Sequence, residues 1–372
     1  MAPEARAILA SAQRFWKGSR SQASSSNASA AAKATEVVSP AAQHVVILQH
    51  GIIGRPKDLK RVEKTMLATL GSSTEASPGT EKPQSLRIVN SKVNVGKTLD
   101  GVARGGKRLA NLIRESVPAG CCLSLVCHSL GGLYGRYALR ELEEERWFAQ
   151  TNVQGLNFIT LATPHVGIME ILAPLRHLIG IGRCIVGQTL LDLALQSPVL
   201  GKDLVDDLAL QSLQRFKHLA AYGNIFDDHM VGAGTSLIVA AVPNRTPHPI
   251  GVPQQCSSSN VDDVEVLSKC FKSKKTEVHY MLQRLSTLPW SRYSLRFQRG
   301  YLPWDNAHVK ICLHCPQDRS RHGESVILHM CSEFTLEADS DLLDHVKHVD
   351  RQLEDGCEVH DVKPTVLGRS SL

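Results

Sequence analysis

The sequence of 372 residues lacks any apolar run that approaches the ~20 residues needed for a transmembrane helix. The longest apolar runs, such as residues 237–242, are far shorter. It also lacks a secretory signal with an apolar h-region, an internal repeat, and a glycine-rich phosphate-binding loop after a strand. These absences argue against a membrane-spanning protein, a secreted protein, a repeat protein and a P-loop nucleotide-binding protein.

Aromatic residues make up only 5% of the chain and charged residues 21%, beside 42% in the hydrophobic set. This composition is typical of a globular protein with a sizeable core and excludes a disordered, collagenous or coiled-coil chain. The net charge of +6 is unevenly placed: residues 1–35 hold five basic residues and one acid, a sum of +4, which leaves +2 for the rest. A nearly neutral body predicts no nucleic-acid partner.

The ten cysteines form no regular framework. In a chain of this length they are typical of reduced thiols in the cytosol or an organelle. Cys312 and Cys315 have a metal-like spacing, with His314, His322 and Cys331 nearby. Structural zinc needs four converging ligands, and no second closely spaced pair is present. The sequence therefore predicts no metal site and no cofactor.

Residues 1–42 differ in composition from the rest and are predicted to form a disordered tail. They are rich in Ala, Ser and basic residues and poor in acids, and Ile8, Leu9 and Phe15 can share one helical face. Such a composition is typical of a chloroplast or mitochondrial transit peptide. The alternative is a flexible tail without a targeting role. We therefore predict a cytoplasmic or organellar protein.

From residue 44 onward, short apolar β-branched runs alternate with segments of helical periodicity. The predicted strands span residues 44–49, 86–89, 122–127, 156–162, 218–225, 236–242, 293–297 and 308–313. The predicted helices span residues 57–70, 99–113, 130–146, 276–288, 323–334 and 341–353. This alternation predicts an α/β fold, with a mostly parallel central sheet and helices on both faces.

One segment interrupts the alternation. Residues 166–213 are apolar and helix-prone, directly after a predicted core strand. They are predicted to form either a lid-like insertion that lines an acyl-chain site or additional core helices. We therefore predict a single domain over residues 43–335 that contains this insertion, followed by a C-terminal helix and tail over residues 336–372.

The sequence from Cys127 to Gly132 carries the main chemical signal. It follows a predicted strand and opens a predicted helix, which is the context of a nucleophile elbow. The sharp turn requires small neighbours around the nucleophile: Gly131 meets this requirement, and Cys127 stands where the motif has glycine. Ser129 is then exposed as a nucleophile, and the N–H of Leu130 can face a developing oxyanion.

A glycine-containing loop after the first strand supports this interpretation. An acyl-transfer site needs a second backbone donor from such a loop, and glycine allows a close approach. His50, Gly51 and Ile52 lie in this loop. We predict that the Ile52 N–H is the second oxyanion donor and that His50 organises the loop.

A serine nucleophile needs a base and a carboxylate that orients the base, and in this fold the chain order is Ser, acid, His. After Ser129, adjacent aspartates occur at Asp227 and Asp228, just past a predicted strand. His308 and His329 are the leading candidates for the base.

The motifs resemble those of the putative serine esterase family of domain of unknown function 676, a lipase-like α/β-hydrolase group. The most diagnostic segments are Thr-Pro-His-x-Gly at residues 163–167 and Asn-x-x-Asp-Asp-His-x-Val-Gly at residues 224–232. The matching stretches are residues 44–54, 126–137, 158–167, 187–191, 222–235 and 302–334. The resemblance implies an α/β-hydrolase fold over about residues 43–335.

The resemblance also selects among the candidates. It implies Ser129 as nucleophile, Asp228 rather than Asp227 as the acid, and His308, before a short strand, as the base. His308 is followed by valine here, where the family usually has asparagine. His165 is implied to support the architecture of the site.

Together these features predict a serine ester hydrolase that acts on lipid acyl esters through an acyl-enzyme. The expected partners are a lipid or acyl-ester substrate and, transiently, a membrane surface. Two alternatives share the fold: a non-catalytic lipid-binding or scaffold protein, and an acyltransferase.

Overall fold

The computed structural model describes seven stretches of the chain: residues 43–71, 85–168, 187–240, 249–256, 275–297, 307–312 and 322–336. All of them belong to one compact unit, residues 1–336. The predicted tail at 1–42, the N-terminal targeting segment and the helix at 341–353 lie outside the described residues, and so does the predicted C-terminal segment at 336–372 beyond residue 336. Within these stretches, no helix combines the length and apolar character that a membrane crossing requires.

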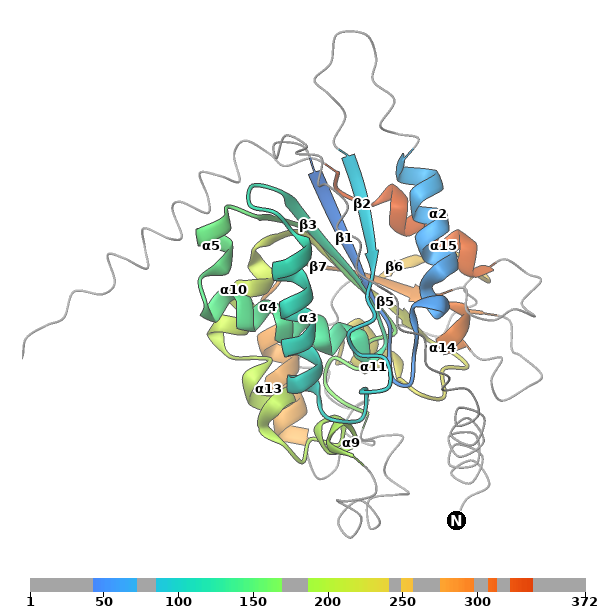
Figure 1. Ribbon diagram of the computed structural model, residues 1–372. Coiled ribbons are helices and arrows are strands. Elements are labelled where there is room, and N and C mark those ends of the chain that lie inside the picture. Colours follow the sequence, from blue (N-terminus) through green and yellow to red (C-terminus); the bar gives the residue numbers. More distant parts are fainter. Residues whose placement is uncertain are drawn as a thin grey trace, which may run out of the picture. The chain divides into compact units, whose positions relative to one another are not determined.

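A seven-stranded sheet forms the centre of the molecule, in the order β2-β1-β3-β4-β5-β7-β6 (Figure 1). Six strands run parallel and β6 is antiparallel to β7. The strands are β1 (Gln43–Gln49), β2 (Ser85–Asn90), β3 (Cys122–His128), β4 (Gln154–Leu161), β5 (Phe216–Asn224), β6 (Gln254–Cys256) and β7 (Trp290–Leu295). The predicted strands at 44–49, 86–89, 122–127, 156–162, 218–225 and 293–297 are thus confirmed within a few residues.

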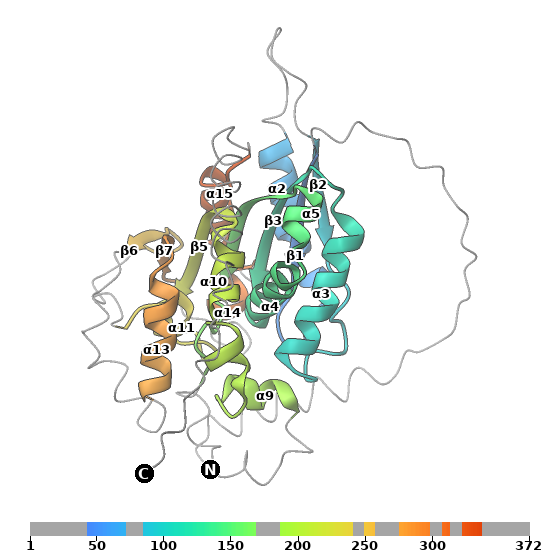
Figure 2. The same cartoon turned by 90° about the vertical axis from the view of Figure 1, so that its left-hand side faces the viewer.

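Helices cover both faces of the sheet, with a separate apolar core under each layer. On one face lie η2 (Pro56–Leu59), α2 (Lys60–Gly71), α14 (Ala307–Lys310) and α15 (His322–Ser332). The other face carries α3 (Val102–Ser116), α4 (Leu130–Glu144), α5 (Trp147–Thr151), α9 (Gln188–Leu193), η5 (Val199–Asp203), α10 (Asp207–Gln214) and α13 (Lys275–Ser286). Figure 2 shows α3, α4, α10 and α13 in front of the sheet and α2 and α15 behind it.

Strand order explains this division. The chain steps from β1 to β2 in one direction, then returns past β1 to β3 and continues in the other direction. Because parallel crossovers are right-handed, reversing the direction moves the connecting helix to the opposite face. The reversal leaves the carboxyl ends of β1 and β3 side by side, and in open α/β sheets this switch point is where ligands bind.

Close glycine contacts hold α3 against α4. A Cβ atom on Gly105 would collide with the ring of Tyr134, and one on Gly106 with Tyr137. These glycines therefore serve helix packing.

The described part of the insertion contributes to the core. Residues 169–186 lie outside the described residues, while α9, η5 and α10 bury Leu191, Leu200 and Leu213 in the core. No lid is identified in this described part, and the additional-helix alternative applies to it.

Two predicted strands are wrong. The predicted strand at 236–242 begins inside helix α11 (Ala233–Leu237), and residues 238–240 form no strand, because both edges of β5 are already paired with β4 and β7. The predicted strand at 308–313 begins as helix α14 (Ala307–Lys310). Ala307 and Ile311, the residue after the helix, are buried at the i,i+4 spacing of one helical face. The expectation that His308 precedes a short strand is wrong for the same reason.

A buried polar network ties the amino-terminal end of the sheet together. Asn157 donates from Nδ2 to the carbonyl of Thr335 over 2.8 Å and accepts the Thr335 N–H at Oδ1 over 2.9 Å. Its Nδ2 also bonds the Ser124 hydroxyl at 2.9 Å, and the hydroxyl lies 2.8 Å from Nε2 of His44. One amide thus links two neighbouring strands to the segment after α15.

Candidate active site

The turn from β3 into α4 places Ser129 at the carboxyl edge of the sheet. Its φ of 54° and ψ of −130° form a strained conformation for a residue with a side chain. The turn is held by its own backbone: the Ser129 N–H donates to Leu161 over 2.8 Å, and Thr163 donates from Oγ1 to the Ser129 carbonyl over 2.9 Å. These bonds hold Ser129 in the turn between the strand and the helix, as the prediction of a nucleophile elbow requires.

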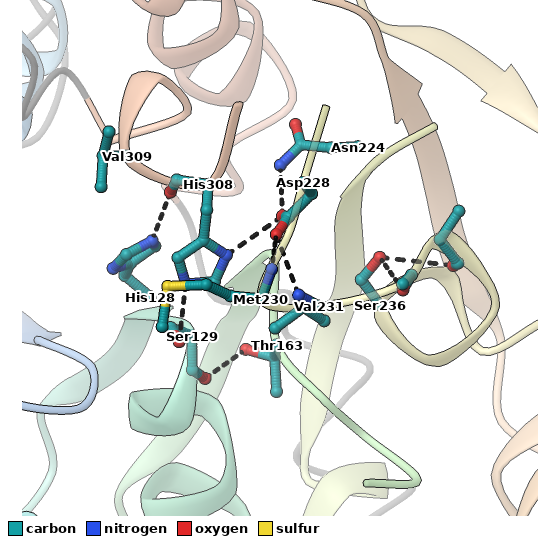
Figure 3. Close-up of polar contacts among 12 residues, drawn as sticks. His128, Ser129, Thr163, Asn224, Asp228, Met230, Val231, Ser236, His308 and Val309 are labelled. Atoms are coloured by element: carbon teal, nitrogen blue, oxygen red, sulfur yellow. Dashed lines mark hydrogen bonds and ion pairs between the residues drawn. The ribbon is translucent and has the colours of Figure 1, made fainter. Parts of the chain in front are cut away.

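Ser129, His308 and Asp228 form one continuous hydrogen-bonded chain (Figure 3). Nε2 of His308 lies 2.9 Å from Oγ of Ser129, and Nδ1 lies 3.0 Å from Oδ2 of Asp228. The residues come from the carboxyl end of β3, the loop after β5 and helix α14. The structure therefore brings together the three residues assigned by the family resemblance.

The Asp228 carboxylate is buried but fully hydrogen-bonded. Besides His308, it accepts from Nδ2 of Asn224 over 2.8 Å and from the N–H groups of Met230 and Val231 over 3.0 and 2.9 Å. Burial by itself raises the pKa of Asp228, but the charge of His308 and these donors outweigh it and lower the pKa below the usual value. The group is thus held as a carboxylate facing Nδ1 of His308.

With the carboxylate on Nδ1, the tautomer of His308 follows. Nδ1 carries the proton that is donated to Asp228, which leaves the lone pair of Nε2 facing the Ser129 hydroxyl. In this arrangement Ser129 donates its proton toward the base. The geometry is that required for general-base activation of a serine.

The other aspartate of the pair contributes through its backbone. Asp227 has a left-handed φ of 56°, and its carbonyl accepts the Ala307 N–H over 3.2 Å. This bond joins the acid loop to the start of α14, one residue before His308. The choice of Asp228 over Asp227 thus agrees with the side-chain geometry.

The loop after β1 lies directly against the nucleophile. A Cβ atom on Gly51 would come 2.7 Å from Cβ of Ser129, so only glycine allows this approach. Gly131 makes the matching approach from α4, against the backbone of Gln49. The two glycines therefore bring the β1 loop and the start of α4 together around Ser129.

Two backbone donors flank this contact. Leu130 is the first residue of α4, so its N–H has no acceptor inside the helix. The Ile52 N–H has no acceptor among the described residues, whereas the next N–H, of Ile53, donates to Oγ1 of Thr98 over 2.9 Å. The N–H groups of Ile52 and Leu130 are thus available to an oxyanion at the position predicted from the sequence.

His50 takes part in the loop and not in the triad. It lies buried with Nδ1 3.0 Å from the Gly51 carbonyl, and burial lowers its pKa. This hydrogen bond is internal to the β1 loop, which agrees with an organising role.

His165 is buried behind the site. Its Nε2 lies 3.0 Å from Oγ1 of Thr160, and its carbonyl accepts from Arg136 over 2.9 Å. Burial, followed by the charges of Arg136 and Arg292, holds its pKa well below the usual value. His165 thus fixes the loop after β4, as expected for a supporting residue.

The other candidate for the base, His329, is not part of the triad. Its Nδ1 lies 3.0 Å from the hydroxyl of Tyr222.

Sequence reasoning gave no role to two residues that hold the site. Nε2 of His128 donates to the carbonyl of His308 over 2.9 Å, and the two rings lie 4.9 Å apart. Arg136, which is 1% exposed, donates to the carbonyls of His165 and Leu204. Only the position of His128 beside Ser129 could have drawn attention to it, and nothing in the sequence signals Arg136.

Left-handed backbone gathers at this edge of the sheet. Of the eight described residues other than glycine with positive φ, four lie one to four residues after the end of a strand: Ile53 after β1, Ser129 after β3, Ala162 after β4 and Asp227 after β5. Such conformations cost about 1–3 kcal/mol each and cluster at functional sites. The strain supports the assignment of this edge as the active site.

Exposed apolar side chains lie on the same loops. Of nine large hydrophobic residues that are exposed in the described part of the chain, four follow the carboxyl ends of β1, β2 and β5: Ile53, Val95, Leu99 and Met230. Several apolar side chains on adjacent loops mark a binding surface more than single ones do.

The strand order, the elbow after β3 and the order Ser, Asp, His define an α/β-hydrolase fold. Within that class, the chain belongs to the family described as "Putative serine esterase (DUF676)", whose model matches residues 39–240. Ser129 and Asp228 lie inside this match, and His308 lies beyond it.

A curated relative and two solved structures are similar to the chain. The protein named "Putative lipase ROG1" of Saccharomyces cerevisiae is 31% identical over 209 residues, which are 53% of this chain and 29% of the yeast protein. The lin2722 gene product of Listeria innocua is 11% identical, with 80% of this chain and 96% of that chain covered and a TM-score of 0.40. The lipase BlEst2 of Bacillus licheniformis is 20% identical, with 55% and 74% covered and a TM-score of 0.33.

Proposed function

We propose that the protein hydrolyses carboxylic esters of lipids through an acyl-enzyme on Ser129. The observation that carries the proposal is the unbroken chain from the Ser129 hydroxyl through His308 to the buried Asp228 carboxylate. Membership of a serine esterase family supports the reaction class.

The reaction begins with attack of Oγ of Ser129 on the ester carbonyl carbon. The proton of the hydroxyl passes to Nε2 of His308, and the Asp228 carboxylate stabilises the imidazolium that forms. The carbonyl oxygen becomes an oxyanion, which the N–H groups of Ile52 and Leu130 bind. Each such donor contributes about 3 kcal/mol in comparable sites.

The tetrahedral intermediate then collapses. The bond between the carbonyl carbon and the alcohol oxygen breaks, and the alcohol leaves with the proton from His308. Water attacks the carbonyl carbon of the acyl-enzyme and gives a proton to Nε2 of His308. The bond between that carbon and Oγ of Ser129 then breaks, His308 returns the proton to Oγ, and the fatty acid leaves. Transfer of the acyl group to another alcohol would follow the same steps with that alcohol in place of water.

The exposed apolar side chains on the carboxyl-edge loops favour a lipid ester over a polar one. Ile53 and Met230 stand on the oxyanion loop and the acid loop, with 38% and 40% of their surfaces exposed. An acyl chain leaving the site would pass such side chains, and burying them against it is favourable. Transient contact with a lipid surface follows from the same feature. The cytoplasmic or organellar location expected from residues 1–42 stays part of the proposal.

The test is labelling of the folded full-length chain by a fluorophosphonate probe, together with release of fatty acid from a long-chain ester. Wild type is expected to label and hydrolyse, and Ser129→Ala is expected to do neither. Ser124→Ala is the matched control, because this serine is also buried and bonded to a histidine at 2.8 Å, but at the other end of the sheet. It should label like wild type.

Two results would overturn the proposal. Folded wild-type protein that fails to label in the presence of detergent or lipid would support a non-catalytic lipid-binding protein. Labelling that survives in Ser129→Ala would place the nucleophile elsewhere.

A further inference from the structure

The loops after β1 and β2 form one continuous surface. The Ile53 N–H donates to Oγ1 of Thr98, and Nδ2 of Asn90 donates to the carbonyl of Pro56, both over 2.9 Å. The exposed side chains of these loops are Ile53, Arg55, Lys57, Lys92, Val95, Lys97 and Leu99, and we call them the β1–β2 loop surface. This surface begins two residues from Gly51, which touches Ser129.

The loops after β1 and β2 carry a net positive charge. Residues 50–59 and 91–100 hold four basic residues and two acids, a sum of +2, which equals the whole net charge of residues 36–372. The carboxylate of Asp100 is already paired with Arg108 at 2.7 Å. The four basic side chains of the β1–β2 loop surface make no ion pair with any described residue.

The charge changes sign across the edge of the sheet. The loop after β5 contains Asp227 and Asp228 and no Lys or Arg between residues 225 and 232. The β1–β2 loops and the loop after β5 thus carry opposite net charges, and Arg296, just after β7, lies 5.4 Å over the ring of Phe226.

Cations and apolar side chains alternate on this surface. Val95 and Leu99, with 37% and 39% of their surfaces exposed, flank Lys97, and Ile53 stands beside Arg55. Membrane-surface binding uses this combination: apolar side chains enter the headgroup boundary while Lys and Arg remain at the level of the phosphates. A nucleic acid would match the charge but leave the apolar side chains without a partner.

We propose that the β1–β2 loop surface docks the protein on bilayers that contain anionic phospholipids. Docking there brings the acyl esters of the bilayer to the side of Ser129 formed by the oxyanion loop. The functional role of this docking rests on the proposed lipid ester hydrolysis, but the binding itself is measured without turnover.

The experiment is sedimentation of the full chain with vesicles of phosphatidylcholine alone and of phosphatidylcholine mixed with phosphatidylglycerol. All proteins carry Ser129→Ala, so failure of docking is distinct from failure of hydrolysis. The parent protein, which carries Ser129→Ala alone, is expected to bind the anionic vesicles more tightly than the neutral ones. It should lose this preference at high salt.

Two double variants divide the surface into its components. Lys92→Gln with Lys97→Gln is expected to weaken binding to anionic vesicles on the order of 30-fold, from the usual contribution of each basic residue near such a surface. Val95→Ser with Leu99→Ser is expected to weaken binding to both kinds of vesicle by about tenfold, because each side chain is already partly buried.

The matched control is Lys107→Gln with Lys217→Gln, which removes the same net charge from the middle of α3 and the amino-terminal end of β5. It should bind like the parent. Equal binding of the parent to neutral and anionic vesicles, or an equal loss in the control, would overturn the proposal. When Ser129 is restored in the protein with Lys92→Gln and Lys97→Gln, this protein should hydrolyse a soluble short-chain ester at the wild-type rate.

Discussion

The sheet carries a buried histidine–serine pair at each end. At the carboxyl end, Nε2 of His308 lies 2.9 Å from Ser129, and at the amino end, Nε2 of His44 lies 2.8 Å from Ser124. All four side chains are at least nine-tenths buried. Distance and burial are therefore nearly the same in the two pairs.

The pairs differ at the far nitrogen of each imidazole. Nδ1 of His308 faces the Asp228 carboxylate, whereas Nδ1 of His44 has no hydrogen-bond partner among the described residues. Burial without a carboxylate lowers the pKa of His44 to about 4. His44 therefore stays neutral and makes a poor base, whereas the imidazolium of His308 would lie beside the Asp228 carboxylate.

The serines differ as well. Ser124 accepts bonds from the backbone and side-chain amides of Asn157 at 3.1 and 2.9 Å, and it lies inside β3 in ordinary extended backbone. Ser129 stands on a strained turn at the end of the same strand. A histidine beside a serine is thus a structural crosslink in one place and a catalytic pair in the other. The carboxylate and the turn make the difference.

The largest expected effect comes from removing that carboxylate. Asp228→Asn keeps the shape of the side chain but offers an amide to Nδ1 of His308, which favours the wrong tautomer of the imidazole. Because of this, kcat for a soluble ester should fall about 10⁴-fold, as in serine proteases. Asp227→Asn is the control, because the Asp228 carboxylate, and not that of Asp227, faces Nδ1 of His308. Steady-state kinetics that show the same loss for both variants would contradict the assignment of Asp228.

A smaller effect is expected from the residue that anchors His308. His128→Phe removes the hydrogen bond to the His308 carbonyl while keeping a ring against the imidazole. Displacement of the base should lower kcat by about ten- to a hundredfold with little change in KM.

His128→Gln, whose amide can still donate, should recover part of the lost rate. If His128→Phe instead lowers only the free energy of unfolding, with kcat intact, His128 has no positioning role. Urea unfolding beside the kinetics separates the two cases.

The smallest expected effect concerns the pair of His44 and Ser124 and is seen in the pH dependence of the free energy of unfolding. The unfolded chain protonates His44 near pH 6.5 and the folded one near pH 4, so the free energy of unfolding falls as the pH drops between these values. From about pH 7 to about pH 5 this single group removes about 2 kcal/mol.

His44→Gln should reduce the pH dependence of unfolding by this amount without changing the pH profile of ester hydrolysis. Denaturant titrations at the two pH values measure the first, and initial rates measure the second. An altered activity profile would mean that the two pairs are not independent.

Sequence periodicity predicted most of the sheet because its strands are short, apolar and bounded by turns. It failed at residues 308–313, where β-branched and apolar residues favour a strand. There the bond from Ala307 to the carbonyl of Asp227 and the burial of Ile311 stabilise a helical turn. Tertiary contacts decide such short segments, and their partners lie about 80 residues away in the chain.

The triad residues could be selected from the sequence because each carries a motif, an order or a resemblance. The supporting contacts could not. His128 bonds a carbonyl 180 positions away, and Arg136 reaches Leu204, 68 positions away. Both are contacts with backbone oxygens, which every residue possesses, so no residue type in the sequence marks the partner.

The left-handed residues at the carboxyl edge have a consequence for protein engineering. Four such conformations together cost several kcal/mol, a large share of the 5–15 kcal/mol by which a typical domain is stable. Substitutions that relax Ile53 or Ala162 would make the protein more robust and move the loops that surround Ser129. Changes around His44 and Asn157, at the other end of the sheet, do not touch the site. The strained edge therefore couples resistance to heat to catalytic rate.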